Sequence, residues 1–198
     1  MPPEQLALVL QALLVVANRP LREEQLRSLL EPELVLTLAD IQQGLCVLNS
    51  LLLSSALELV QVASGYRLQI RGAYAVYVGR LQEERLPRFS RALMETLALI
   101  AYRQPITRSE IEEIRGVSVS SQIMRTLQER EWIRMAGHRE VPGRPALWVT
   151  TREFLDALGV QKLSDLPPLA DVEALGAQVL GDMTQEHGQE SGDIRQNQ

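Results

Sequence analysis

The sequence predicts a mainly helical fold with short β-hairpins (an α+β fold), in which one structural unit occurs twice. Two observations carry this prediction. A pair of helical segments joined at a proline recurs 85 residues further along the chain, from Pro20 to Pro105. Each copy then continues with a third helical stretch and ends in residues whose polarity alternates as in a half-buried strand.

The two copies of the helix pair are LLVVANRPLREEQLRSL (13–29) and ALIAYRQPITRSEIEEI (98–114). In each copy the proline ends the first helix, because its ring fixes φ and it has no amide hydrogen for the helix ladder. In the second copy, Thr107 and Glu110 have the spacing of a capping box, so a new helix should begin there.

In the first copy, the third helix is expected over 34–53. The hairpin that follows is expected over 57–71, with Ser64 and Gly65 as its two-residue turn. In the second copy, the third helix is expected over 122–131, and two strand-like runs then flank the loop GHREVPGRP (137–145). A short helix over 151–158, ended by Gly159, should close the unit.

Three helices followed by a hairpin is the order of a winged-helix domain, which is a variant of the helix-turn-helix. The sequence therefore predicts two tandem winged-helix domains, over 1–84 and 85–169. Between them, 73–91 is expected to contain a helix and a boundary at Pro87, after which Ser90 caps the next helix. Residues 170–198 are polar and acidic, and we expect this C-terminal tail to be disordered.

The formal net charge of −5 is spread unevenly along the 198 residues. Residues 1–80 sum to −1, residues 81–160 to +1 and residues 161–198 to −5. Proteins that live by phosphate contacts usually carry a basic surplus, because each contact releases counterions. The balance in the two expected domains disfavours non-specific nucleic-acid binding.

No constellation of residues indicates catalysis, and we expect a protein that is not an enzyme and has no cofactor or metal. His138 and His187 lack neighbouring ligands at metal-binding spacing, and no phosphate-binding loop is present. Cys46 lies among apolar residues and is expected to be an inert core residue. The uncharged run over 5–18 is too short to span a bilayer, and no signal peptide is recognisable, so a cytoplasmic protein is expected.

Winged helices often read DNA with the third helix, which makes a DNA-binding regulator the rival function. The first copy has no Lys or Arg in this helix, whereas the second offers Arg125, and its hairpin loop carries Arg139 and Arg144 as possible nucleic-acid contacts. The leucines of the first copy exceed one core stripe, which indicates either a thick core or a dimer interface. The candidates for dimerisation are Leu34, Leu38, Leu45 and Leu52.

Specific segments resemble the bacterial segregation and condensation protein B family. They are ETLALIAYRQPITRSEIEEIRGV (95–117), GHREVPGRPALWVTTREFLDALGV (137–160) and KLSDLPPL (162–169), with further likeness in 14–30 and 57–78. The resemblance covers about 6–169. The chain departs from the family at Glu131, where glycine is common, and at 118–121, where acidic caps are usual.

The resemblance implies a non-enzymatic subunit that forms a homodimer through its N-terminal winged-helix domain. It also implies binding to the middle segment of a kleisin, segregation and condensation protein A, and through it to the SMC ATPase. That complex acts in chromosome condensation and segregation, and thus in the cell cycle and cell division, at the nucleoid in the cytoplasm. DNA would be contacted indirectly or weakly, and no membrane or small-molecule substrate is implied.

A kleisin segment without its own core needs an extended apolar groove on its partner. The candidates lie on the first two helices of the second copy and are Leu93, Leu97, Ile100, Tyr102, Ile106 and Ile111. Most of these must also serve the core. A stand-alone tandem winged-helix regulator of transcription stays the alternative, and the sequence favours a rigid structural role for the loop 137–145 over a phosphate-binding one.

Overall fold

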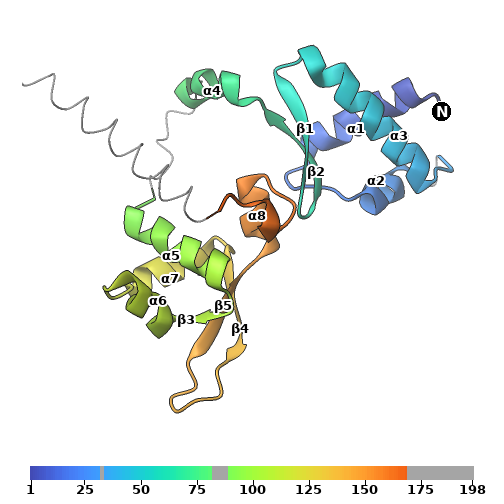
Figure 1. Cartoon of the computed structure of the whole chain (residues 1–198). Helices are drawn as coiled ribbons and strands as arrows, with labels where there is room; N and C mark the ends of the chain where they lie inside the picture. The colour runs from blue at the N-terminus through green and yellow to red at the C-terminus, as the bar shows by residue number, and fades with distance from the viewer. Residues whose placement is uncertain (32–33, 82–88, 169–198) are drawn as a thin grey trace, which may run out of the picture. The chain divides into compact units, whose positions relative to one another are not determined.

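The structure is a computed structural model that describes residues 1–31, 34–81 and 89–168. The predicted domain boundary at 84/85 and the predicted tail over 170–198 lie outside the described residues. The first winged-helix domain contains α1 (Pro3–Val16), α2 (Glu23–Leu30), α3 (Leu38–Leu51), β1 (Leu57–Val62) and β2 (Gly65–Ile70), with a 3₁₀ turn over Leu52–Ser54 (Figure 1). Three helices and a hairpin therefore occur in the predicted order.

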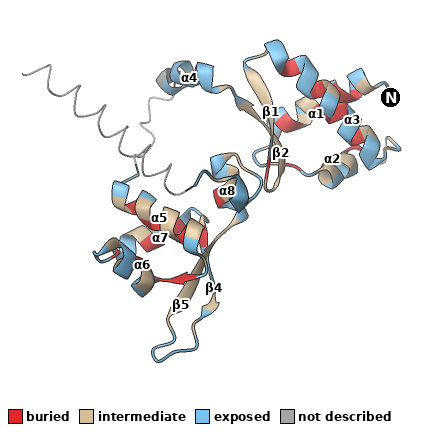
Figure 2. Ribbon diagram, in the orientation of Figure 1, coloured by how far each residue is buried: buried red, intermediate tan, exposed pale blue. Residues whose placement is uncertain are grey.

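The core of the first domain lies where α1 crosses α3. A methyl group built on Gly44 of α3 would come within 2.8 Å of Leu10 Cδ1 and 3.0 Å of Leu6 Cγ, so glycine permits this close approach. Figure 2 shows the buried residues along α1 and α3. The buried core consists of Leu6, Ala7, Leu10, Leu14, Leu21, Leu26, Leu30, Ile41, Leu45, Leu48 and Leu52.

Helix α3 begins four residues later than predicted. Thr37 accepts a hydrogen bond from the backbone N–H of Asp40, whose carboxylate accepts the backbone N–H of Thr37 at 2.7 Å. This capping box fixes the first turn and was missed because its acceptor is Asp rather than Glu or Gln. Leu34 and Leu36 precede the helix and pack beside the core from a segment without regular secondary structure.

The first hairpin is antiparallel and pairs Leu57 with Ile70 and Val62 with Gly65. Its two-residue turn is Ala63–Ser64, one residue earlier than predicted. Leu21, just after Pro20, forms an isolated bridge with Tyr66 of β2. The hairpin is thereby joined to the corner between α1 and α2. The hairpin is followed by a 3₁₀ turn (Gly72–Tyr74) and α4 (Ala75–Leu81), which lies within the stretch predicted to contain a helix.

The second winged-helix domain repeats this arrangement with α5 (Arg91–Arg103), β3 (Ile106–Thr107), α6 (Arg108–Arg115), α7 (Ser121–Glu129), β4 (Ile133–His138) and β5 (Ala146–Thr150). The closing helix α8 (Arg152–Leu158) and a 3₁₀ turn (Leu163–Asp165) follow. The three strands are antiparallel in the order β3-β5-β4. Ile106 pairs with Trp148 as Leu21 bridges Tyr66 in the first domain, so the repeat seen in the sequence is a repeat of structure.

The caps predicted at Ser90, Thr107 and Gly159 are confirmed, and Ser120 and Thr151 cap two further helices. The side chains of Ser90, Thr107, Ser120 and Thr151 each accept a backbone N–H at the start of a helix. Gly159 ends α8 in the left-handed conformation. These caps satisfy amides that have no partner inside their helices, and so they fix where each helix begins.

Glu131 has a left-handed backbone with φ of 57°, although it is not glycine. Side chains other than glycine cost roughly 1 kcal/mol in this region. We therefore expect Glu131→Gly to raise the free energy of unfolding by up to about 1 kcal/mol, measured by urea denaturation. Glu129→Gly, at a helical position of α7, is the control and should lower it, because glycine weakens a helix by about 1 kcal/mol. An equal loss in both variants would contradict this account of Glu131.

Candidate interaction surfaces

The described residues contain no group of three or more His, Cys, Asp or Glu side chains placed to hold a metal ion. No helix in the same part of the chain is long and apolar enough to cross a membrane.

Cys46 is exposed on α3, so the prediction that it is a core residue is wrong. Its apolar neighbours in the sequence face the core, whereas Cys46 falls on the outer side of the helix.

Helix α1 presents apolar side chains on its outer side as well as on its core side. Leu8 and Val15 are each 59% exposed and lie seven residues apart, which places them on one face, and Val16 beside them is 79% exposed. No charged residue occurs between 5 and 18. A helix that is apolar all round is normally covered on both sides, so this outer face has the character of an interface. The sequence shows this uncharged run over 5–18, yet the candidates for dimerisation that it suggests lie on and just before α3.

The residues predicted for dimerisation divide between core and surface. Leu45 and Leu52 are buried in the core, so they are not available to a partner, and Leu34 is half-buried against the same core. Leu38, at the start of α3, is 37% exposed. Helical spacing could not tell which leucine stripe of α3 faces α1, because both stripes are apolar.

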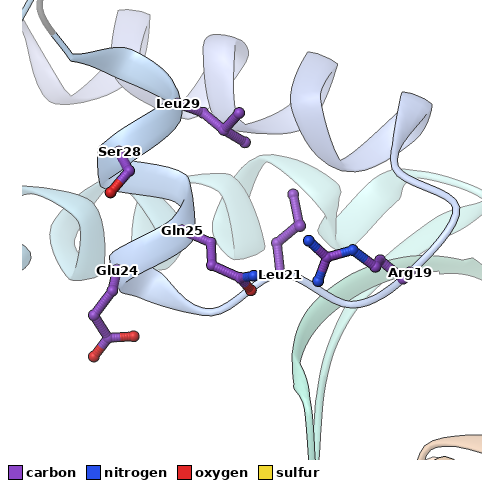
Figure 3. Close-up of a pocket in the computed structure, with 6 residues that line it drawn as sticks. All are labelled: Arg19, Leu21, Glu24, Gln25, Ser28 and Leu29. Atoms are coloured by element: carbon purple, nitrogen blue, oxygen red, sulfur yellow. The ribbon is translucent and has the colours of Figure 1, made fainter.

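A shallow groove of about 360 Å³ lies beside α2 and the loop before it. Figure 3 shows Arg19, Leu21 and Leu29 pointing into the same space, whereas Glu24 points away from it. Leu29 is exposed, and its counterpart 85 residues on, Ile114 of α6, is exposed as well. Both domains thus leave an aliphatic side chain uncovered at the same position of the second helix.

Five of the six residues predicted to bind a kleisin lie in the core of the second domain. Leu93, Leu97, Ile100, Ile106 and Ile111 are buried, and only Tyr102 is half-exposed. The five buried side chains cannot line a surface groove in this fold. The apolar side chains that α5 and α6 do expose are Met94 and Ile114, with Val117 just after α6.

The third helices of the two domains differ in charge. Helix α3 carries one charged residue, Asp40, and no Lys or Arg. Helix α7 exposes Arg125. Arg130, which follows α7, lies over the ring of Phe89 at 4.5 Å from its centroid and is thereby occupied by a cation–π contact.

The two loop arginines of the second hairpin are held by acidic partners. Arg139 Nη1 lies 2.6 Å from Glu110 Oε1 at the start of α6, and Arg144 Nη2 lies 3.2 Å from Glu140 Oε1. The first of these ion pairs ties the hairpin to the body of its domain. These contacts agree with a rigid structural hairpin, and nucleic-acid contact by Arg125, Arg139 or Arg144 stays a prediction.

The carboxylate of Glu110 joins the cap of α6 to the hairpin. Its Oε2 accepts the backbone N–H and the hydroxyl of Thr107, each at 2.9 Å, and its Oε1 accepts from Arg139. The hydrogen bonds from Thr107, followed by the charge of Arg139, lower the pKa of Glu110 from its ordinary 4.5. All of these contacts favour the ionised form.

Because the folded state lowers this pKa, the contribution of Glu110 to stability is complete above about pH 4.5 and is lost as the pH falls through the lowered value. We expect Glu110→Gln to destabilise the second domain by about 1 kcal/mol at pH 7, a modest figure because the carboxylate is partly exposed. The difference from the parent protein should shrink at pH 3.5. Urea titrations at both pH values check this, and a difference independent of pH would contradict the assignment.

The fold defines a class, because two successive units of three helices and a hairpin make a tandem winged-helix protein. The family described as segregation and condensation complex subunit ScpB matches residues 8–169, and the chain belongs to this family. The chain is 47% identical over 165 residues to the segregation and condensation protein B homolog of Coxiella burnetii, covering 83% of this chain and 79% of the relative.

The chain is also similar to other proteins of this name. The segregation and condensation protein B of Desulforamulus reducens is 43% identical over 174 residues, which cover 85% of this chain and 91% of that protein. Among solved structures, ScpB from Mycobacterium tuberculosis is 32% identical, with a TM-score of 0.38, over 81% of this chain and 98% of that chain.

Proposed function

We propose that the chain is a non-enzymatic architectural subunit of a bacterial SMC–kleisin complex, acting in chromosome condensation and segregation. The observation that carries this proposal is the apolar outer face of α1 in the first winged-helix domain, together with the absence of Lys and Arg from α3. Helix α3, which would read a DNA groove, has no cation, and α1 exposes Leu8, Val15 and Val16. Such a surface suits a protein partner and not a phosphate backbone.

In this proposal the two domains have separate tasks. The first, within 1–84, forms the homodimer through the outer face of α1, with Leu38 of α3 as a further contact. The second, within 85–169, binds the middle segment of the kleisin, and the SMC ATPase is reached through the kleisin. Met94, Ile114 and Val117 replace the buried candidates as the apolar contacts for that segment, with Tyr102 kept from the original set.

The kleisin contact is tested with the middle segment of the kleisin from the same organism. Ile114→Asp and Val117→Asp should each weaken binding at least about tenfold, because an aspartate in an apolar contact loses its water without gaining a partner. Val35→Asp, at a fully exposed position of the first domain, is the matched control and should bind normally. Unchanged affinity in both second-domain variants would remove this surface from the proposal.

The rival function is distinguished by DNA. A tandem winged-helix regulator should bind a specific duplex in isolation, at about 10⁻⁸ M or tighter, with a steep dependence on salt. The architectural subunit should bind duplex DNA weakly and the kleisin fragment stoichiometrically. Fluorescence anisotropy with labelled duplexes selected from the organism's genomic DNA measures the first, and calorimetry with the fragment measures the second. Tight specific DNA binding without fragment binding would overturn the proposal.

A further inference from the structure

A second cavity, of about 410 Å³, opens on the second winged-helix domain beside β4, β5 and α8. We call it the arginine pocket, because two arginines line it. Arg134 comes from β4 and Arg152 from the first position of α8. The full lining is Gln104, Arg134, Thr150, Thr151, Arg152, Glu153, Leu155 and Leu163.

Arg134 and Arg152 differ from the two arginines in the loop of the second hairpin. Arg139 and Arg144 each pair with a glutamate. Within the described residues, the side chains of Arg134 and Arg152 have neither a hydrogen bond nor an ion pair. The cavity is thus lined by two cations, and the side-chain donors of both lack a partner among the described residues.

The polar floor of the pocket is already satisfied. The side-chain oxygen of Gln104 accepts the backbone N–H of Thr150 at 2.7 Å, and its amide donates to the Thr150 hydroxyl at 3.0 Å. The Thr151 hydroxyl donates to the carbonyl of Glu131 and accepts the N–H of Phe154. The floor is therefore fixed by internal bonds, and the guanidinium groups remain as the donors for a ligand.

The charge and the apolar lining limit what the ligand can be. Glu153 offsets one of the two arginines, so the pocket carries one surplus positive charge. That surplus suits a single carboxylate better than a run of phosphates, because a second anion would meet Glu153. Leu155 and Leu163 add an aliphatic wall. A planar carboxylate is also the group that a guanidinium fork binds with two parallel hydrogen bonds.

We propose that the arginine pocket receives an Asp or Glu side chain, flanked by an aliphatic residue, from the partner polypeptide that the second domain binds. The proposal rests on the proposed function in that the partner is the kleisin middle segment. It adds the chemistry by which the segment is recognised and oriented. The apolar surface around Ile114 supplies contact area, and the arginine pocket supplies a charged anchor that fixes one residue of the segment.

The test uses the full chain and the kleisin middle segment, with dissociation constants from calorimetry. Arg134→Gln and Arg152→Gln should each weaken binding about tenfold, the effect of losing one charge-assisted contact. Arg125→Gln removes an exposed arginine that is also unpaired in the described residues but lies outside the pocket, and it should change affinity less than about twofold. All three positions are exposed, so thermal unfolding should match that of the parent protein.

The acidic partner is identified by replacing each Asp and Glu of the segment in turn with Asn or Gln. One replacement should weaken binding to the parent protein but have little further effect on Arg134→Gln, as expected for two groups in one contact. If the parent protein binds the segment and both pocket variants bind as tightly as Arg125→Gln, the arginine pocket is overturned while the proposed function stands. If the parent protein does not bind the segment, the proposed function fails first. Tighter binding of duplex DNA than of the segment, lost in the pocket variants alone, would assign the pocket to phosphate and overturn the proposal.

Discussion

Gly65→Ala is expected to unfold the first winged-helix domain at denaturant concentrations that leave the second intact. A methyl group on Gly65 would lie 2.4 Å from the carbonyl carbon and oxygen of Leu21 and 2.7 Å from the nitrogen of Arg22. These are backbone atoms, which cannot move aside as the end of a side chain can. The φ of Gly65 is 139°, a conformation that other residues rarely adopt.

The same contact explains the size of the effect. Leu21 and Tyr66 exchange two backbone hydrogen bonds, of 2.9 and 2.8 Å, that join the hairpin to the corner after α1. Relieving the clash moves Leu21 away from Tyr66. The cost of the strain and the loss of the two hydrogen bonds then both lower the free energy of unfolding. We expect a loss of about 3 kcal/mol or more in the free energy of unfolding.

The two tryptophans make the measurement selective. Trp132 and Trp148 both lie in the second domain, so their fluorescence reports that domain, whereas far-ultraviolet circular dichroism reports both. Gly65→Ala should lower the urea midpoint of part of the dichroism signal and leave the fluorescence midpoint in place. Gly72→Ala is the matched control, because a methyl group there meets nothing within 4 Å. A Gly65→Ala protein as stable as Gly72→Ala would refute the contact.

Replacing both Leu8 and Val15 by aspartate is expected to convert the proposed dimer into a monomer. The two side chains lie on the outer face of α1, each 59% exposed, so the fold tolerates a polar replacement there. Two aspartates on each protomer would bring four like charges into an apolar contact. We expect dimer affinity to fall by a factor of at least about 100, in line with burying charges that have no partner.

Sedimentation velocity across a range of concentrations measures this change. Val141→Asp, at an exposed apolar position of the second hairpin, is the control and should sediment as the parent protein does. Circular dichroism shows whether the double variant stays folded. A folded double variant that remains dimeric would place the dimer contact elsewhere, with Leu38 the next residue to replace.

The fold could be predicted from the sequence because most of the residues that begin and end its helices act locally. Pro105 directly follows Gln104, the residue that caps the C-terminus of α5, and the Thr107–Glu110 spacing sets the start of α6. Helix α1 ends at Val16, so the prediction that Pro20 itself ends the first helix is wrong. The start of α3 was missed for an equally local reason, since an Asp stands where the capping box usually has Glu or Gln. Such signals depend on a few neighbouring residues and not on how the helices pack.

The candidate surfaces could be predicted far less well, because burial depends on packing between distant segments. Leu45 and Leu8 are both leucines in stretches that are apolar on more than one face, yet one is in the core and the other exposed. The choice is made where Gly44 lets α3 approach α1, which no periodicity reveals. Likewise, the arginine pocket assembles Arg134 and Arg152 from two elements whose sequence neighbours give no hint of a shared cavity.

Light scattering of the purified chain, alone and after mixing with the kleisin middle segment, tests the central claim most directly. We expect the mass of two chains for the protein alone, and a stable complex of higher mass that contains both polypeptides after mixing. A monomer that does not change its mass when the kleisin segment is added would contradict it.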